Sequence, residues 1–240
     1  MRSLRYLSVL FIVLYNGLTV QAAKQTNFLF FLVDDMGWAD IGANGSTFHE
    51  TPHIDRLAKS GMRFTQGYAA GSVCSPTRAS IMTGKHPVRV DITDWIPGQS
   101  NRPTNPLLHP EDRHSLPLKE VTLAEALREE GYRTLHVGKW HLGGPPFSLP
   151  AQHGFDVNVG GSEHGAPGHF FYPYKGSWKV PTTGQPVLKI TLPDGEEGEY
   201  LTDRLTDEAL SLIETNRGNP FFLYFPHYAV HTPLQAKKEM

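Results

Sequence analysis

The sequence predicts an α/β fold in which helices flank a mixed, largely parallel central sheet. Apolar segments of strand length alternate along the chain with segments of helical apolar spacing, and helix-capping residues stand where several helical segments begin. With 240 residues, 39% of them hydrophobic, the chain can bury a substantial core. Its formal net charge of −2 offers no general attraction to nucleic acid.

The first expected elements lie in the amino-terminal third. Asn27–Val33 is an apolar run of strand length that ends in two carboxylates. Thr51–Gly61 reads as a helix, because Thr51 suits the N-cap and Pro52 suits the first turn. A further helix is expected to begin within Ala79–Thr83.

The later elements continue the alternation. A capping-box pattern at Thr122 predicts a helix that runs to Gly131. A strand is expected at Arg133–Val137, a helix at Leu201–Thr215 and a buried strand at Pro220–Phe225. Because helices separate successive strands, the sheet should have parallel character.

Two long intervals interrupt this pattern and are expected to serve function. They are Asp91–Pro117, rich in proline and polar residues, and Gly143–Gly198, rich in glycine, proline and histidine. Three histidines of the second interval could line a substrate loop: His153, His164 and His169. No histidine spacing identifies a transition-metal site, and residues 23–240 show no sign of a second domain.

Residues 1–22 predict a secretory signal peptide. Arg2 and Arg5 precede the apolar run Tyr6–Tyr15, and Val20–Ala22 provides small residues for cleavage. The alternative is a membrane anchor, but the run is short and is interrupted at residues 16 and 17. No later segment is long and apolar enough to span a bilayer. We therefore expect an exported protein, secreted or periplasmic, with no stable membrane span.

The only cysteine, Cys74, is the strongest chemical signal. An exported protein usually pairs its cysteines, so a solitary one needs another explanation. Arg78 lies four residues later, and a guanidinium beside a helix start creates a favourable anion site. A buried structural cysteine is one alternative. A cysteine-thiolate phosphatase is another, but its Cys-x5-Arg loop differs from the Cys-x3-Arg spacing found here.

Asp34 and Asp35 end the first predicted strand. Open α/β sheets bind ligands at the carboxyl ends of their strands, and adjacent carboxylates suit calcium or magnesium. The alternative for this pair is a solvated turn or a helix cap.

Two further segments follow predicted strands. Lys139 and His141 come after Arg133–Val137, where a fixed ammonium could stabilise negative charge on a ligand; a solvated lysine and a structural histidine are the alternatives. His231 follows the last strand and could deliver a proton near neutral pH. His227 is the rival for that role, although it reads better as a structural neighbour.

Four ordered segments resemble those of the type I sulfatases, the formylglycine-dependent enzymes of the alkaline phosphatase superfamily. They are Asp34-Asp35-Met36-Gly37, Cys74-Ser75-Pro76-Thr77-Arg78 with its continuation to Lys85, Gly138-Lys139-Trp140-His141, and His231-Thr232-Pro233. The resemblance implies that a formylglycine-generating enzyme oxidises Cys74 to Cα-formylglycine. The hydrate of that aldehyde would then be the nucleophile that attacks a sulfate ester.

The resemblance also implies roles for the other motif residues. Calcium would be ligated by Asp34, Asp35 and modified Cys74. Arg78 would hold formylglycine in place, and Lys139 would contact the sulfate. His141 would hydrogen-bond the formylglycine hydrate or the sulfate. His231 would contact the sulfate and act as the general acid that protonates the departing alcohol.

The chain is expected to be the front part of such a catalytic domain. After His231 it has neither the Asp-Asn pair that completes the calcium site in sulfatases nor a further lysine and a smaller subdomain. The function implied is hydrolysis of a sulfated small molecule or glycan, with export favouring a sulfated carbohydrate. Two alternatives stay open: a phosphate or phosphonate monoester hydrolase of the same superfamily, and an inactive fragment that only binds sulfated ligands.

Overall fold

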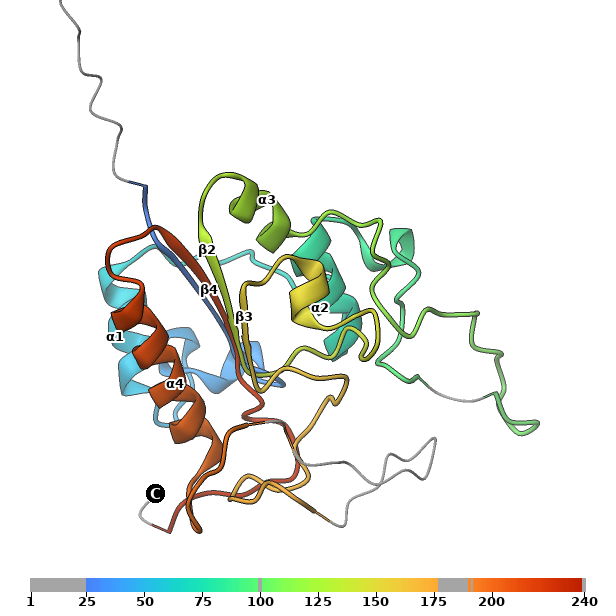
Figure 1. The fold of residues 1–240 in the computed structure, drawn as a ribbon. Helices are drawn as coiled ribbons and strands as arrows, with labels where there is room; N and C mark the ends of the chain where they lie inside the picture. The colour runs from blue at the N-terminus through green and yellow to red at the C-terminus, as the bar shows by residue number, and fades with distance from the viewer. Residues whose placement is uncertain (1–24, 99–100, 177–189, 191, 239–240) are drawn as a thin grey trace, which may run out of the picture.

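The centre of the molecule is a parallel sheet with the strand order β1-β4-β2-β3 (Figure 1). The structure, a computed structural model, describes residues 25–98, 101–176, 190 and 192–238. The strands are β1 (Phe28–Leu32), β2 (Arg133–Val137), β3 (Val157–Val159) and β4 (Phe221–Pro226). The predicted α/β class is confirmed, and every pairing between these described strands is parallel.

Helices cover both faces of the sheet (Figure 1). They are α1 (Pro52–Ser60), α2 (Cys74–Thr83), α3 (Leu123–Glu129) and α4 (Leu201–Thr215), and short 3₁₀ turns occur at Trp38–Asp40, Gly42–Asn44, Pro87–Arg89 and Pro150–His153. Helix α4 packs on one face, and α2 and α3 pack on the other. Among the described helices, none is long and apolar enough to cross a membrane. The predicted signal peptide, residues 1–22, lies outside the described residues.

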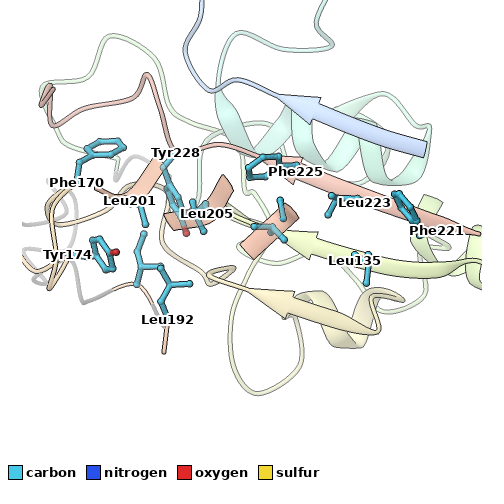
Figure 2. Packing of buried hydrophobic residues seen from close by; sticks show 13 residues of the cluster. Leu135, Phe170, Tyr174, Leu192, Leu201, Leu205, Phe221, Leu223, Phe225 and Tyr228 are labelled. Atoms are coloured by element: carbon cyan, nitrogen blue, oxygen red, sulfur yellow. The ribbon is translucent and has the colours of Figure 1, made fainter. Parts of the chain in front are cut away.

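Strand β4 is buried along its whole length because it lies between two apolar layers. Successive side chains of a strand point to opposite faces, so Leu223 and Phe225 join the core beneath α4, whereas Phe222 and Tyr224 join the core beneath α2 and α3. Figure 2 shows the first of these cores, with Leu205 of α4 among its members. Packing on both faces fixes where β4 ends in the sheet, and therefore where the residues that follow it lie.

Two local expectations were wrong. Helix α2 begins at Cys74 rather than within Ala79–Thr83, because Pro76 falls in the first turn, where proline is tolerated. Thr51 does not cap α1 with its side chain; its hydroxyl accepts a hydrogen bond from the Gly42 amide at 2.8 Å. By contrast, the capping box at Thr122 is confirmed at the start of α3.

Candidate functional site

The carboxyl ends of three parallel strands bring most of the motif residues to one edge of the sheet. Asp34 follows β1, Lys139 and His141 follow β2, and His231 follows β4. Cys74 stands at the first position of α2, whose Arg78 reaches Asp34 and the Lys139 carbonyl. The sequence placed these residues in separate motifs, and the parallel sheet brings their strand ends together.

Gly138 allows β2 to turn into the site. Its φ of 113° lies in the left-handed region, and a Cβ at this position would stand 2.1 Å from the Pro226 carbonyl oxygen. The next residue, Lys139, donates its amide hydrogen to the same carbonyl at 2.8 Å. The close approach of the two backbones holds Lys139 at the end of β4.

Asp34, Arg78 and Lys139 form what we call the buried side of the site. Arg78 Nη2 donates to Asp34 Oδ1 at 2.9 Å, Lys139 Nζ donates to Asp34 Oδ2, and Arg78 Nη1 donates to the Lys139 carbonyl at 2.8 Å. The exposed fractions are 6% for Asp34, 1% for Arg78 and 0% for Lys139. Two buried cations share one carboxylate, so the cluster carries an excess positive charge that suits an oxyanion.

The ion pairs determine the charge states of this cluster. Burial raises the pKa of Asp34, but the Lys139 ammonium and the Arg78 guanidinium outweigh it and hold that pKa below its ordinary value. Burial and the neighbouring Arg78 charge lower the pKa of Lys139, with Asp34 opposing them in part. Asp34 is therefore a carboxylate at neutral pH and serves as the counterion of both cations.

His141 lies beside this cluster, 3% exposed, with its backbone in the left-handed region at a φ of 56°. Its Nε2 contacts the Ile96 carbonyl, and within the described part of the chain its buried Nδ1 has no hydrogen-bond partner. Burial, and then the Lys139 charge, lower the pKa of His141 well below its ordinary value. The ring is therefore neutral, with Nε2 turned toward Ile96 and Nδ1 buried next to Gly165.

Asp35 and His231 form the open side of the site. Asp35 Oδ2 lies 3.6 Å from His231 Nε2, and the side chains are 56% and 21% exposed, respectively. Backbone hydrogen bonds between Asp34 and the segment after β4, to Ala229 and from Val230, hold the two chain segments together. The predicted general acid therefore lies at the strand ends, where solvent reaches it.

The rival histidine, His227, lies in the core. It is 5% exposed, and its ring packs against Phe31 at 4.5 Å and Phe225 at 4.2 Å between centroids. Burial lowers its pKa to about 4, so the ring is neutral at physiological pH. His227 therefore has a packing role, and His231 is the better placed of the two to exchange a proton.

Cys74 is partly exposed and forms no disulfide. It lies close enough to Arg78 and Lys139 for electrostatic interaction with both. Next to it, the buried Ser75 donates to the His141 carbonyl and accepts from the Ile96 amide, both at 3.0 Å. Sequence reasoning missed this positioning role of Ser75, although the residue stands inside the Cys74 motif.

The fate of the loop histidines differs. His153 is wholly buried, and its Nε2 lies 3.0 Å from Ser148 Oγ, so the expectation that it lines a substrate loop was wrong. His164 lies 3.8 Å from Glu163, and His169 contacts the Phe171 backbone. Neither contact identifies a substrate role.

The donor types at the strand end suit calcium, but their number is small. Asp34 and Asp35 offer hard carboxylate oxygens, whereas calcium takes about six to eight oxygen ligands. Across the described residues, no group of three or more histidine, cysteine, aspartate and glutamate side chains could hold a metal ion. The two carboxylates could thus provide part of a calcium site, with further ligands required.

Comparison with known proteins assigns the chain to one family. The family model described as "Sulfatase" matches residues 26–240. The chain is similar to the N-acetylgalactosamine-6-sulfatase of Mus musculus, at 36% identity over 236 residues, covering 93% of this chain and 43% of the relative. It is also similar to the arylsulfatase A of Bos taurus, at 35% identity over 232 residues, covering 88% of this chain and 42% of the relative.

Solved structures agree with this assignment. The crystal structure of Ps i-CgsB in complex with k-i-k-neocarrahexaose matches at 33% identity and a TM-score of 0.67, covering 89% of this chain and 47% of that one. The chain thus spans less than half the length of each of these three proteins.

Proposed function

The chain belongs to the sulfatase family, and from this premise we propose that it is part of a sulfuric ester hydrolase that releases sulfate from sulfated carbohydrates. The observation that carries the proposal is the buried side of the site. Arg78 and Lys139 share the single carboxylate of Asp34 and lie within electrostatic reach of Cys74. A site with surplus positive charge beside a reactive position suits a bound sulfate ester.

The proposed nucleophile is a hydroxyl of the hydrate of formylglycine, the aldehyde that a formylglycine-generating enzyme makes from Cys74. Cys74 begins a helix of 10 residues, so the amide groups of the first turn and the Arg78 guanidinium both favour an anion near it. In this role Lys139 and Arg78 balance the negative charge of the sulfate group, which redistributes during S–O cleavage. His141, neutral and tightly held, would orient the reacting groups.

His231 would donate the proton that the departing alcohol needs. Its partial exposure and its contact with Asp35 let it exchange protons with solvent between turnovers. Calcium would supply positive charge next to the nucleophile. Asp34, Asp35 and the modified Cys74 would hold it, together with further ligands from outside this set. Binding of calcium would also require Asp34 to share its oxygens with the two cations that now engage them.

The substrate class rests on the relatives. One is an N-acetylgalactosamine-6-sulfatase, and one solved structure holds a neocarrahexaose. Together with the export predicted from residues 1–22, these likenesses support a sulfated carbohydrate as substrate and a secreted or periplasmic location for the protein.

The decisive experiment combines mass spectrometry of the peptide that contains Cys74 with a turnover assay. We expect formylglycine at position 74, and we expect Cys74→Ala to lower aryl sulfate turnover on the order of 10⁴-fold or more. Ser80→Ala, on the same helix but outside the site, serves as the control and should keep turnover close to that of the unaltered chain.

Three outcomes would overturn this proposal. An active protein with only unmodified cysteine at position 74 would exclude the formylglycine mechanism. Faster turnover of an aryl phosphate or phosphonate than of an aryl sulfate would favour the related ester hydrolases. Binding of sulfated ligands without turnover, in a chain that carries formylglycine, would assign it a binding role.

A further inference from the structure

A cavity of about 680 Å³ opens beside the start of α2. The side chains that bear on its chemistry come from two segments and are Ser72, Val73, Asp94, His109, Glu111 and His114. No lysine or arginine is among the described residues that line it. The cavity therefore differs sharply in charge from the buried side of the site.

The cavity shares a wall with the position of the proposed nucleophile. Ser72 and Val73 directly precede Cys74 in the chain, and Val73 is the residue that precedes the first turn of α2. The opposite wall is fastened to the same helix, since the Ile96 amide donates to Ser75 Oγ at 3.0 Å. Two residues of the cavity wall therefore stand directly before the proposed nucleophile in the chain.

Hydrogen bonds between backbone amides and aspartate side chains hold the loop that carries the acidic residues. Asp112 accepts hydrogen bonds from the amides of Thr93 and Asp94, each at 2.9 Å, so both of its oxygens are engaged. Asp94 Oδ1 accepts from the Trp95 amide at 2.8 Å. Its Oδ2 is shielded from solvent, and no donor among the described residues reaches it.

Asp94 Oδ2 and His114 Nε2 converge near Gly98. A Cβ built on Gly98 would lie 4.0 Å from the carboxylate oxygen and 3.9 Å from the imidazole nitrogen. The φ of Gly98 is 79°, a conformation that glycine adopts without strain. Glu111 adds an exposed carboxylate to the lining.

We propose that this cavity holds the sugar that carries the sulfate, and that it selects an uncharged, hydroxyl-rich sugar over a uronate or a sugar with a second sulfate. The inference rests on the proposed function. Carboxylates accept hydrogen bonds from sugar hydroxyls, and the carboxylate of Glu111 is exposed in the lining. An anionic group placed near Asp94 and Glu111 would meet like charge without a lysine or arginine in the lining to offset it.

The test measures ligand binding by calorimetry in a Cys74→Ala background, where turnover is absent. The probes are 4-nitrophenyl sulfate, galactose 6-sulfate and glucuronate 2-sulfate. We expect galactose 6-sulfate to bind about tenfold or more tightly than the sulfated uronate. The double variant Asp94→Asn with Glu111→Gln should reduce the ratio of the two dissociation constants, glucuronate 2-sulfate over galactose 6-sulfate, to about threefold or less. Its affinity for the aryl sulfate should not change.

A matched control removes a carboxylate elsewhere. Glu129→Gln alters an exposed residue of α3 that is outside the cavity lining, and it should not change the ratio. Equal affinity for the two sugars would overturn this inference but not the proposed function. The same holds if the affinity ratio is unchanged in the Asp94→Asn, Glu111→Gln double variant. Failure of all three sulfate esters to bind would instead count against the proposed function.

Discussion

The two sides of the site place adjacent carboxylates in opposite environments. On the buried side, Asp34 is 6% exposed and holds two cations; on the open side, the Asp35 side chain is 56% exposed and lies 3.6 Å from a histidine nitrogen. Two residues adjacent in sequence thus differ in burial and in the charged groups that they contact. Asp34 is therefore part of the structural core as well as of the site, whereas Asp35 belongs to the site alone.

The backbone explains this division. Asp34 continues from β1 and exchanges backbone hydrogen bonds with the segment after β4, at 3.0 Å to the Ala229 carbonyl and 2.8 Å from the Val230 amide. Asp35 then adopts a φ of 60°, which turns the chain out of the sheet. The change of direction between the two residues separates an internal counterion from a solvent-facing carboxylate.

The largest expected effect tests this contrast directly. Asp34→Asn keeps the shape but removes the charge, leaving Arg78 and Lys139 buried without a counterion. We expect a loss of about 3–5 kcal/mol in the free energy of unfolding. Urea titration at pH 7 would measure it.

Asp35→Asn is the matched control, since it makes the same chemical change one residue later. Asparagine tolerates the left-handed backbone of Asp35, and exposed ion pairs contribute little, so the loss should stay below about 1 kcal/mol. Equal losses from the two variants would show that the buried and open sides do not differ in this way.

The two histidines that follow β4 differ in burial in the same way as the two aspartates. Burial holds the pKa of His227 at about 4, below the ordinary value of 6.5. As the pH falls below 6.5, the unfolded chain binds a proton that the folded chain does not, so stability falls until about pH 4 and then levels off. Between pH 6.5 and pH 4, the titration of His227 should lower the free energy of unfolding by roughly 3 kcal/mol.

His227→Phe should remove this part of the acid sensitivity, because phenylalanine can pack between Phe31 and Phe225 without titrating. The measurement is unfolding free energy at pH 7 and at pH 4.5. The exposed His53 of α1, changed to glutamine, is the control and should leave the pH dependence in place. An unchanged slope in His227→Phe would contradict the burial argument.

The smallest effect on stability is expected on the open side. His231→Gln should change the free energy of unfolding by no more than about 0.5 kcal/mol, because the residue lies outside the core. Turnover of a sugar sulfate should nevertheless fall about 10²–10⁴-fold, since the departing alcohol needs a proton. Aryl sulfate provides the internal control, because its phenolate leaves without needing a proton. Its turnover should fall much less. Equal losses on both substrates would remove His231 from the role of general acid.

Local patterns predicted the elements whose signals are local. Strand β2 has the bounds that the sequence indicated, α4 matches its apolar spacing, and the capping box at Thr122 forms as its residues suggest. Strand β3 was missed because three residues, Val157–Val159, are too few to show a period. The start of α2 was misplaced because proline, usually a helix breaker, is compatible with a first turn.

Sequence patterns alone predict the residue types of the site, their order in the chain and their positions at strand ends. They do not predict that Lys139 and Arg78 both pair with Asp34, across separations of 105 and 44 residues, or that His227 is buried while His231 is partly exposed; these features appear only in the folded molecule. The physical reason is that periodicity and capping act over a few residues. Charge pairing and burial, in contrast, depend on which strands become neighbours and where each one ends.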